Sequence, residues 1–246
     1  MSIAYGGTTT QGQPIGILML DTKFPRIIGD VGNGFTYDFP VKYHTVKGAS
    51  PSRVVIEKDP MLLQPFIDGV KKLEEEGCQA VATSCGFLIM FQKELAAAVN
   101  IPVATSGLLQ VPFVSQMLAP DKKIGILTAN SNTLDERHFK AGRINHDDIA
   151  IQGMQEFREF YSSFVDGKTQ YDIKKVESEV VAAAQKLIKE NPNVGAIVCE
   201  CTNMAPFSPE VNRATGLPVF DVVTLIRFIS MGVLRGMTNN FRNQLA

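Results

Sequence analysis

The sequence predicts an α/β protein with two similar lobes, each a mainly parallel sheet flanked by helices, related by a pseudo-twofold duplication. Short apolar, β-branched runs alternate with helical stretches, an order typical of parallel sheets with right-handed crossovers. The run Ile-Gly-Ile-Leu occurs at 15–18 and again at 124–127, an offset of 109 residues. The order strand, long loop, helix, strand with cysteine, helix, strand therefore occurs twice.

Two cysteines strengthen the case for duplication. Cys85 follows the apolar run 80–83, and Cys201 follows the apolar run 195–199. A Pro-Val pair follows each cysteine at the same distance, so cysteine and Pro-Val are both shifted by 116 residues. The two offsets differ by seven residues, which one change in loop length explains.

The first half of the chain is expected to open with a buried strand at 14–20, because this run is continuously apolar. The glycine-rich segment 21–52 is long enough to suggest a lid or binding loop. Asp59-Pro60 predicts a helix start and Gly77 its end. The further elements expected in this half are a strand at 80–83, a helix at 87–99 and a short strand at 101–103.

The second half is expected to repeat these elements with a strand at 122–129, an amphipathic helix at 176–189 and a strand at 195–199. A short strand at 217–220 and an apolar helix at 222–237 follow. We expect one lobe to comprise residues 14–118 and 219–246, with Cys85, and the other residues 119–218, with Cys201. The active-site cleft is expected between them, because ligands bind at the carboxyl ends of such strands.

Bulk composition is that of an ordinary globular protein, with 246 residues, 45% apolar and 20% charged. The formal net charge of −1 points to neither nucleic acid nor an anionic membrane as partner. The polar, Gly/Thr-rich start does not resemble a signal peptide, and the apolar patches are too short or interrupted for a transmembrane helix. Four cysteines make no disulfide framework in a chain this long, so we expect a reduced, cytoplasmic protein.

Thiols at two matching strand ends suit proton transfer on opposite faces of one carbon. Cys85-Gly86 is also expected to open a helix, whose positive end favours a thiolate and a substrate carboxylate. A free thiol has a pKa of about 8.5, so a modest decrease would make it a usable base. The alternative is that these cysteines only pack in the core, which is our expectation for Cys78 and Cys199.

Other kinds of site have weaker support. The spacing of Cys199 and Cys201 is not a zinc spacing, and no cluster of histidines accompanies it. A Cys-His nucleophile pair stays open, although no local signature supports it. The segment 29–34 lacks the spacing of a phosphate or dinucleotide loop. We therefore expect neither a metal nor a cofactor.

These features together resemble the aspartate/glutamate/hydantoin racemase superfamily, with the resemblance extending from about Pro14 to Met237. It is carried by the paired cysteines, the repeated Ile-Gly-Ile-Leu and the pair Cys201-Thr202. The segments 21–33, 83–87 and 200–204 are similar to a subgroup that includes the algal dimethylsulfoniopropionate lyases.

The resemblance implies two α/β lobes with a cleft, no cofactor, no metal, and a homodimer or higher homo-oligomer. Cys85 and Cys201 would be the acid/base pair acting on a small-molecule carboxylate. Residues beside the two cysteines and after the first strand of the second half would bind that substrate: Ser84, Gly86, Phe87, Thr202, Asn203, Thr128 and Asn130.

The sequence departs from the amino-acid racemases beside both cysteines. Gly86-Phe87 stands where many of them have Asn-Thr, and Asn203 stands where glutamate racemases have His. These changes argue against aspartate or glutamate as substrate. Arg26 is the best cation for a carboxylate, although a solvated loop arginine is the alternative. Asp21 is a further candidate for the substrate site, with a turn role equally open.

Three functions follow from these residues. The first is a cofactor-independent racemase or epimerase of a small α-substituted carboxylate. The second is a lyase that removes the same α-proton and expels a β-leaving group, as in release of dimethyl sulfide and acrylate from dimethylsulfoniopropionate. The third is a non-catalytic ligand-binding protein on the same scaffold.

Overall fold

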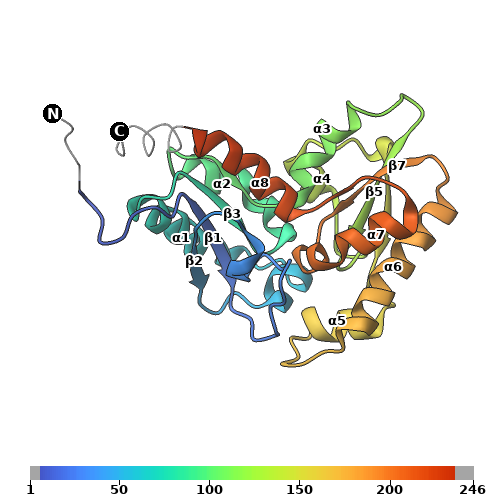
Figure 1. Cartoon of the computed structure of the whole chain (residues 1–246), viewed down its shortest axis with the longest axis horizontal. Helices are drawn as coiled ribbons and strands as arrows, with labels where there is room; N and C mark the ends of the chain where they lie inside the picture. The colour runs from blue at the N-terminus through green and yellow to red at the C-terminus, as the bar shows by residue number, and fades with distance from the viewer. Residues whose placement is uncertain (1–5, 236–246) are drawn as a thin grey trace.

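The computed structural model describes residues 6–235, and its core is two four-stranded parallel sheets, one in each lobe (Figure 1). The first sheet has the strand order β2-β1-β3-β4, and the second has the equivalent order β6-β5-β7-β8. Neighbouring strands pair in parallel throughout. The strands are β1 Ile15–Leu20, β2 Val41–Val46, β3 Ala80–Thr83, β4 Val103–Ala104, β5 Lys123–Thr128, β6 Ile149–Gly153, β7 Val194–Cys199 and β8 Val219–Phe220.

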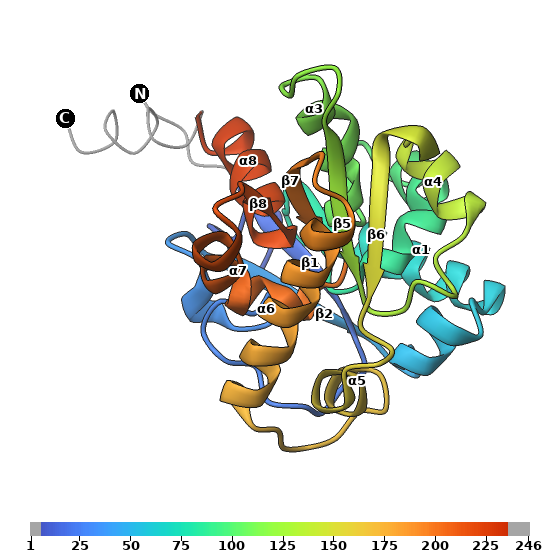
Figure 2. The same cartoon turned by 90° about the vertical axis from the view of Figure 1, so that its right-hand side faces the viewer.

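Helices flank both sheets, as the fold class predicted. The α-helices are α1 Leu63–Glu75, α2 Gln92–Ala97, α3 Val111–Ser115, α4 Glu136–Gly142, α5 Arg158–Phe164, α6 Ile173–Glu190, α7 Ser208–Thr215 and α8 Val222–Val233. Figure 2 shows α5 below the second sheet, near the blue segment that follows β1. Within the described residues, no helix is both long and apolar enough to cross a membrane.

The central strands are buried because helices cover both faces of each sheet. Every residue of β1 and of β3 is buried, which explains their unbroken apolar sequence. The helical segment begins after Asp59, as predicted, but its first turn is a 3₁₀ helix, Pro60–Leu62, in which the Asp59 side chain accepts a hydrogen bond from the Met61 N–H. α1 follows directly, and Gly77 after it has a φ of 90°, as predicted. The chain then returns through α8, whose Val222 and Ile226 pack in the core of the first lobe.

The structure differs from the predicted elements mainly at the sheet edges. The segment 21–52 contains β2, which pairs with β1; its half-exposed residues gave no clear apolar run. The helix expected at 87–99 is a 3₁₀ helix, Gly86–Phe91, followed by α2. Because β8 pairs with β7, the second sheet extends past the predicted boundary at 218. The division into lobes otherwise stays a prediction, and its last residues, 236–246, lie outside the described part, as does the end of the helix expected at 222–237.

Candidate active site

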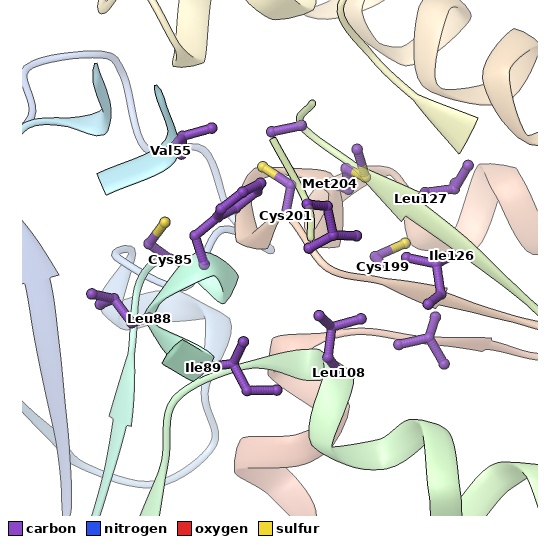
Figure 3. Packing of buried hydrophobic residues seen from close by; sticks show 14 of the residues in the cluster. Val55, Cys85, Leu88, Ile89, Leu108, Ile126, Leu127, Cys199, Cys201 and Met204 are labelled. Atoms are coloured by element: carbon purple, nitrogen blue, oxygen red, sulfur yellow. The ribbon is translucent and has the colours of Figure 1, made fainter. Parts of the chain in front are cut away.

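The two cysteines lie at equivalent points of the two lobes. Cys85 comes two residues after β3 ends, and Cys201 comes two residues after β7 ends. Each immediately precedes a 3₁₀ helix of six residues, Gly86–Phe91 in one lobe and Thr202–Phe207 in the other. In Figure 3 the two side chains come from opposite lobes, whereas Cys199 lies deeper in the second lobe beside Ile126.

A pocket between the lobes contains both cysteines. The unfilled space in it, including its opening, measures about 410 Å³. Its lining comes from both lobes: Leu20, Thr22, Phe24, Arg26, Pro51, Val55, Ser84, Cys85, Gly86, Phe87, Ala129, Phe164, Val165, Glu200, Cys201, Thr202 and Asn203.

Most of the predicted site residues meet in this pocket, namely Arg26, Ser84, Gly86, Phe87, Thr202, Asn203 and the two cysteines. Asp21 does not line it: its carboxylate accepts from the Gly48 N–H, in the loop after β2, at 3.2 Å. Thr128 and Asn130 also lie outside the lining. The Thr128 hydroxyl donates to Glu200, and the Asn130 amide donates to the Tyr161 hydroxyl. A substrate contact for these three residues stays a prediction.

Arg26 is held in a fixed orientation by three neighbours. Its guanidinium donates to Asp30 Oδ1 at 2.8 Å and to Thr22 Oγ1 at 2.9 Å. It also lies 4.3 Å from the centre of the Phe24 ring. These contacts fix the orientation of the planar group, which lowers the entropic cost of holding a carboxylate.

Direct hydrogen bonds join the lobes at the pocket. The Thr202 hydroxyl donates to the Ser84 carbonyl at 2.7 Å, and the Asn203 amide donates to Asp30 Oδ2 at 3.1 Å. Since Asp30 also binds Arg26, residues from both cysteine lobes fix the position of the cation. Thr202 and Asn203 therefore connect the two lobes at the pocket.

Sequence reasoning missed Glu200, a carboxyl that is 1% exposed and lines the pocket. Its Oε2 accepts from the Thr128 hydroxyl at 2.8 Å and from the Ala129 N–H at 3.3 Å. Burial raises the pKa of Glu200 to about 7, although these two hydrogen bonds oppose the rise. The sequence contains a signal for it, because Glu200 lies 116 residues after Ser84, a predicted site residue.

Both thiols have raised pKa values in the pocket. Burial raises the pKa of Cys85, the Glu200 charge raises it further, and the N–H groups of Phe87 and Leu88 and the Arg26 charge oppose the rise. Burial and Glu200 also raise the pKa of Cys201, opposed by a single N–H group, that of Asn203. The lowered pKa expected from the helix start is therefore not found.

Phenylalanines from both lobes form an apolar wall of the pocket, which was not predicted from the sequence. Phe24 of the first lobe contacts Phe164 of the second edge-on, with ring centres 5.1 Å apart. Beside them, the Tyr171 hydroxyl donates to the Pro25 carbonyl at 3.4 Å. These contacts join segments far apart in sequence, and no local pattern indicates them.

The other cysteines pack in the core, as expected. Cys78 and Cys199 are buried outside the pocket, and burial raises the pKa of Cys78 to about 11. Within residues 6–235, no group of three or more His, Cys, Asp or Glu side chains is placed to hold a metal ion. A site without metal or cofactor stays a prediction.

Comparison with solved structures supports the fold. A mutant of arylmalonate decarboxylase matches with a TM-score of 0.58 at 13% identity, over 89% of this chain and 94% of that one. A glutamate racemase from Bacillus anthracis matches with a TM-score of 0.58 at 15% identity, over 92% and 82%. An allantoin racemase from Klebsiella pneumoniae has a TM-score of 0.58 at 14% identity, over 90% and 88%.

Sequence relatives are more similar. A dimethylsulfoniopropionate lyase of Durusdinium sp. clade D is 32% identical over 235 residues, covering 93% of this chain and 76% of that protein. Dimethylsulfoniopropionate lyase 3 of Emiliania huxleyi (strain CCMP1516) is 30% identical over 220 residues, covering 85% of this chain and 57% of that protein. The family model for Asp/Glu/Hydantoin racemase matches residues 45–226. The chain therefore belongs to the Asp/Glu/hydantoin racemase family of enzymes, and dimethylsulfoniopropionate lyases are among its sequence relatives.

Proposed function

We propose that the protein is a lyase that eliminates a thioether from a small β-sulfonio carboxylate, converting dimethylsulfoniopropionate to dimethyl sulfide and acrylate. The observation that carries this proposal is the charge of the pocket. Among the lining residues that the structure describes, Arg26 is the one cation, and it is already paired with Asp30. A substrate with one carboxylate fits this lining better than the dicarboxylates aspartate and glutamate.

The apolar part of the lining suits the other end of such a substrate. Phe24, Phe87 and Phe164 line the pocket. Aromatic faces attract a cation with an apolar surface, such as a dimethylsulfonium group. Burial of this group among phenylalanines and of the carboxylate at Arg26 would orient the carbon between them toward the thiols.

Cys85 is the better candidate for the base. Two backbone N–H groups and the Arg26 charge favour its thiolate, whereas one N–H group favours that of Cys201. In the proposed step the thiolate takes the α-proton and becomes a thiol. The electrons of the C–H bond form the double bond of acrylate, and the C–S bond breaks with its electron pair leaving on dimethyl sulfide. The scheme uses no cofactor.

Racemisation or epimerisation is the second candidate, and one observation favours it. Elimination needs one base, whereas Cys201 lies at the equivalent point of the other lobe. Two thiols on opposite lobes suit removal of a proton from one face of a carbon and its return to the other. Deprotonation of the α-carbon is common to both reactions.

Headspace gas chromatography separates the proposals. The purified protein incubated with dimethylsulfoniopropionate should release dimethyl sulfide, and the Cys85→Ser/Cys201→Ser double variant should not. Absence of dimethyl sulfide from the wild type, together with inversion of an amino or hydroxy acid on a chiral column, would contradict elimination and support racemisation. Tight ligand binding with neither product would support a binding protein. The expected homo-oligomer and cytoplasmic location stay predictions.

A further inference from the structure

Glu200 is a buried acid that the elimination scheme leaves without a role. It occupies the position that Ser84 occupies in the first lobe. Ser84 Oγ accepts the Leu20 N–H at 2.9 Å, and Glu200 Oε2 accepts the equivalent Ala129 N–H at 3.3 Å. A neutral hydroxyl therefore suffices for this contact. The ionisable charge of the carboxyl in the second lobe is not needed for it.

The second carboxylate oxygen lies between the two cysteine segments. A Cβ built on Gly86 would collide with Glu200 Oε1 and with the Glu200 carbonyl oxygen. The side-chain oxygen Oε1 therefore lies directly against Gly86. Gly86 is the neighbour of Cys85, and Glu200 is the neighbour of Cys201. Glycine at 86 provides the space in which the carboxyl of one lobe reaches the thiol segment of the other.

The charged and titratable groups around Glu200 leave its charge uncompensated. Arg26 and Asp30, from the segment after β1, pair with each other at 2.8 Å. The remaining titratable neighbours are the thiols of Cys85, Cys201 and Cys199. Burial raises the pKa of all three, and the Glu200 charge raises it further, although at Cys199 the Asp221 charge has the larger effect. The residues that α5 contributes to the lining, Phe164 and its neighbour Val165, do not titrate. A thiolate beside an ionised Glu200 would put two anions in one buried site, which is unfavourable.

We propose that Glu200 controls the charge of the pocket thiols, so that the site holds one negative charge rather than two. An ionised Glu200 disfavours a thiolate beside it, whereas a protonated Glu200 leaves a thiol free to ionise. Glu200 does not act on the substrate directly in this proposal. It acts through the ionisation of the thiols and is therefore a positioning residue.

The proposal predicts a specific pH dependence, because Glu200 titrates near neutrality. Below the Glu200 pKa of about 7, the carboxyl is protonated and a thiolate forms beside a neutral group. Above that pH the carboxyl is charged, so the fraction of thiolate stops rising. In a Glu200→Gln variant the group stays neutral, and the fraction rises about tenfold for each pH unit.

The test is the rate of modification of Cys85 by methyl methanethiosulfonate, followed by mass spectrometry of peptides from pH 5.5 to pH 8.5. Glu200→Gln keeps an oxygen that can accept the Thr128 and Ala129 hydrogen bonds. Glu179→Gln is the matched control, because its carboxylate accepts the N–H groups of Glu159 and Phe160 outside the pocket. The rate in Glu200→Gln relative to wild type should be near one at pH 5.5 and more than tenfold at pH 8.5, whereas Glu179→Gln should match wild type throughout.

A ratio that does not change between these pH values would overturn the proposal, because a merely structural effect would change the rate equally at both. Infrared spectra give a second readout where modification is too slow: a protonated carboxyl band should titrate near pH 7 in wild type and be missing in Glu200→Gln. Absence of that band from the wild type would also overturn it. The proposal rests on the proposed function only in using the same thiols, and neither readout requires turnover, so its failure is distinguishable from failure of elimination.

Discussion

The two lobes present a cysteine at the same point of the same fold but surround it differently. Ser84 and Gly86 flank the first cysteine, whereas Glu200 and Thr202 flank the second. The Glu200 charge raises the pKa of both thiols, but a cation and two backbone N–H donors oppose the rise at the first, and only one N–H donor opposes it at the second. The duplication fixes where the thiols are, and the neighbouring residues make their surroundings unequal.

This division distinguishes elimination from a symmetric two-base reaction. A racemase that works in both directions needs each thiol as base and as acid in turn. A lyase needs one base, and the other lobe can supply binding and proton handling. The unequal surroundings of Cys85 and Cys201 fit the second case.

The largest expected effect comes from replacing each thiol separately. Cys85→Ser should lower kcat for release of dimethyl sulfide by about 10³-fold, since loss of a general base typically costs 10²- to 10⁴-fold. Cys201→Ser should lower it by only about tenfold. Cys78→Ser, outside the pocket, is the control and should retain wild-type kcat. Equal losses for the two pocket thiols would show that the lobes act symmetrically.

A smaller effect is expected from Arg26→Lys, which keeps the charge and loses the planar fork. A charge-assisted hydrogen bond contributes about 1.5–3 kcal/mol, so kcat/KM should fall about 10- to 100-fold, mainly through KM. Arg53→Lys is the matched control, because Arg53 pairs with Asp59 at 2.6 Å outside the pocket. Steady-state kinetics measure both. An unchanged KM in Arg26→Lys would mean that the substrate carboxylate binds elsewhere.

The smallest effect concerns how the lobes are held together. Thr202→Val removes the hydroxyl that donates to the Ser84 carbonyl and leaves that buried acceptor without its partner. We expect a loss of about 1–3 kcal/mol in the free energy of unfolding, measured with urea and circular dichroism. Ser178→Ala, which removes an exposed bond within α6, should cost less than about 0.5 kcal/mol. Equal costs would show that the bridge between the lobes contributes little.

Much of the fold could be predicted from the sequence because its signals are local. Buried parallel strands are unbroken apolar runs, so β1, β3, β5 and β7 were found close to their observed bounds. The edge strands β2 and β6 were not found. β2 consists mostly of half-exposed residues and gives no such run, whereas β6 is mostly buried but its apolar run is only three residues long. The 3₁₀ helix Gly86–Phe91 was predicted as part of an α-helix, because its apolar composition does not distinguish the two kinds of helix.

Residues of the site could be predicted only where the duplication of the sequence identified them. The repeated offset identified Cys85 and Cys201, and applying it to Ser84 would also have identified Glu200. Phe24 and Phe164 come together through packing of distant segments, which no local pattern records. The thiol pKa values were misjudged because burial and a neighbouring acid outweigh the donors at the start of each 3₁₀ helix.

Elimination from a β-sulfonio carboxylate is tested most directly by proton NMR in D₂O. One sample would contain the protein, dimethylsulfoniopropionate, and a panel of amino acids, hydroxy acids and diacids. The proposed function predicts acrylate and dimethyl sulfide in equal amounts, with the α-protons of the other compounds unexchanged. Intact dimethylsulfoniopropionate, together with loss of the α-proton signal of an amino or hydroxy acid, would contradict it and identify the protein as a racemase.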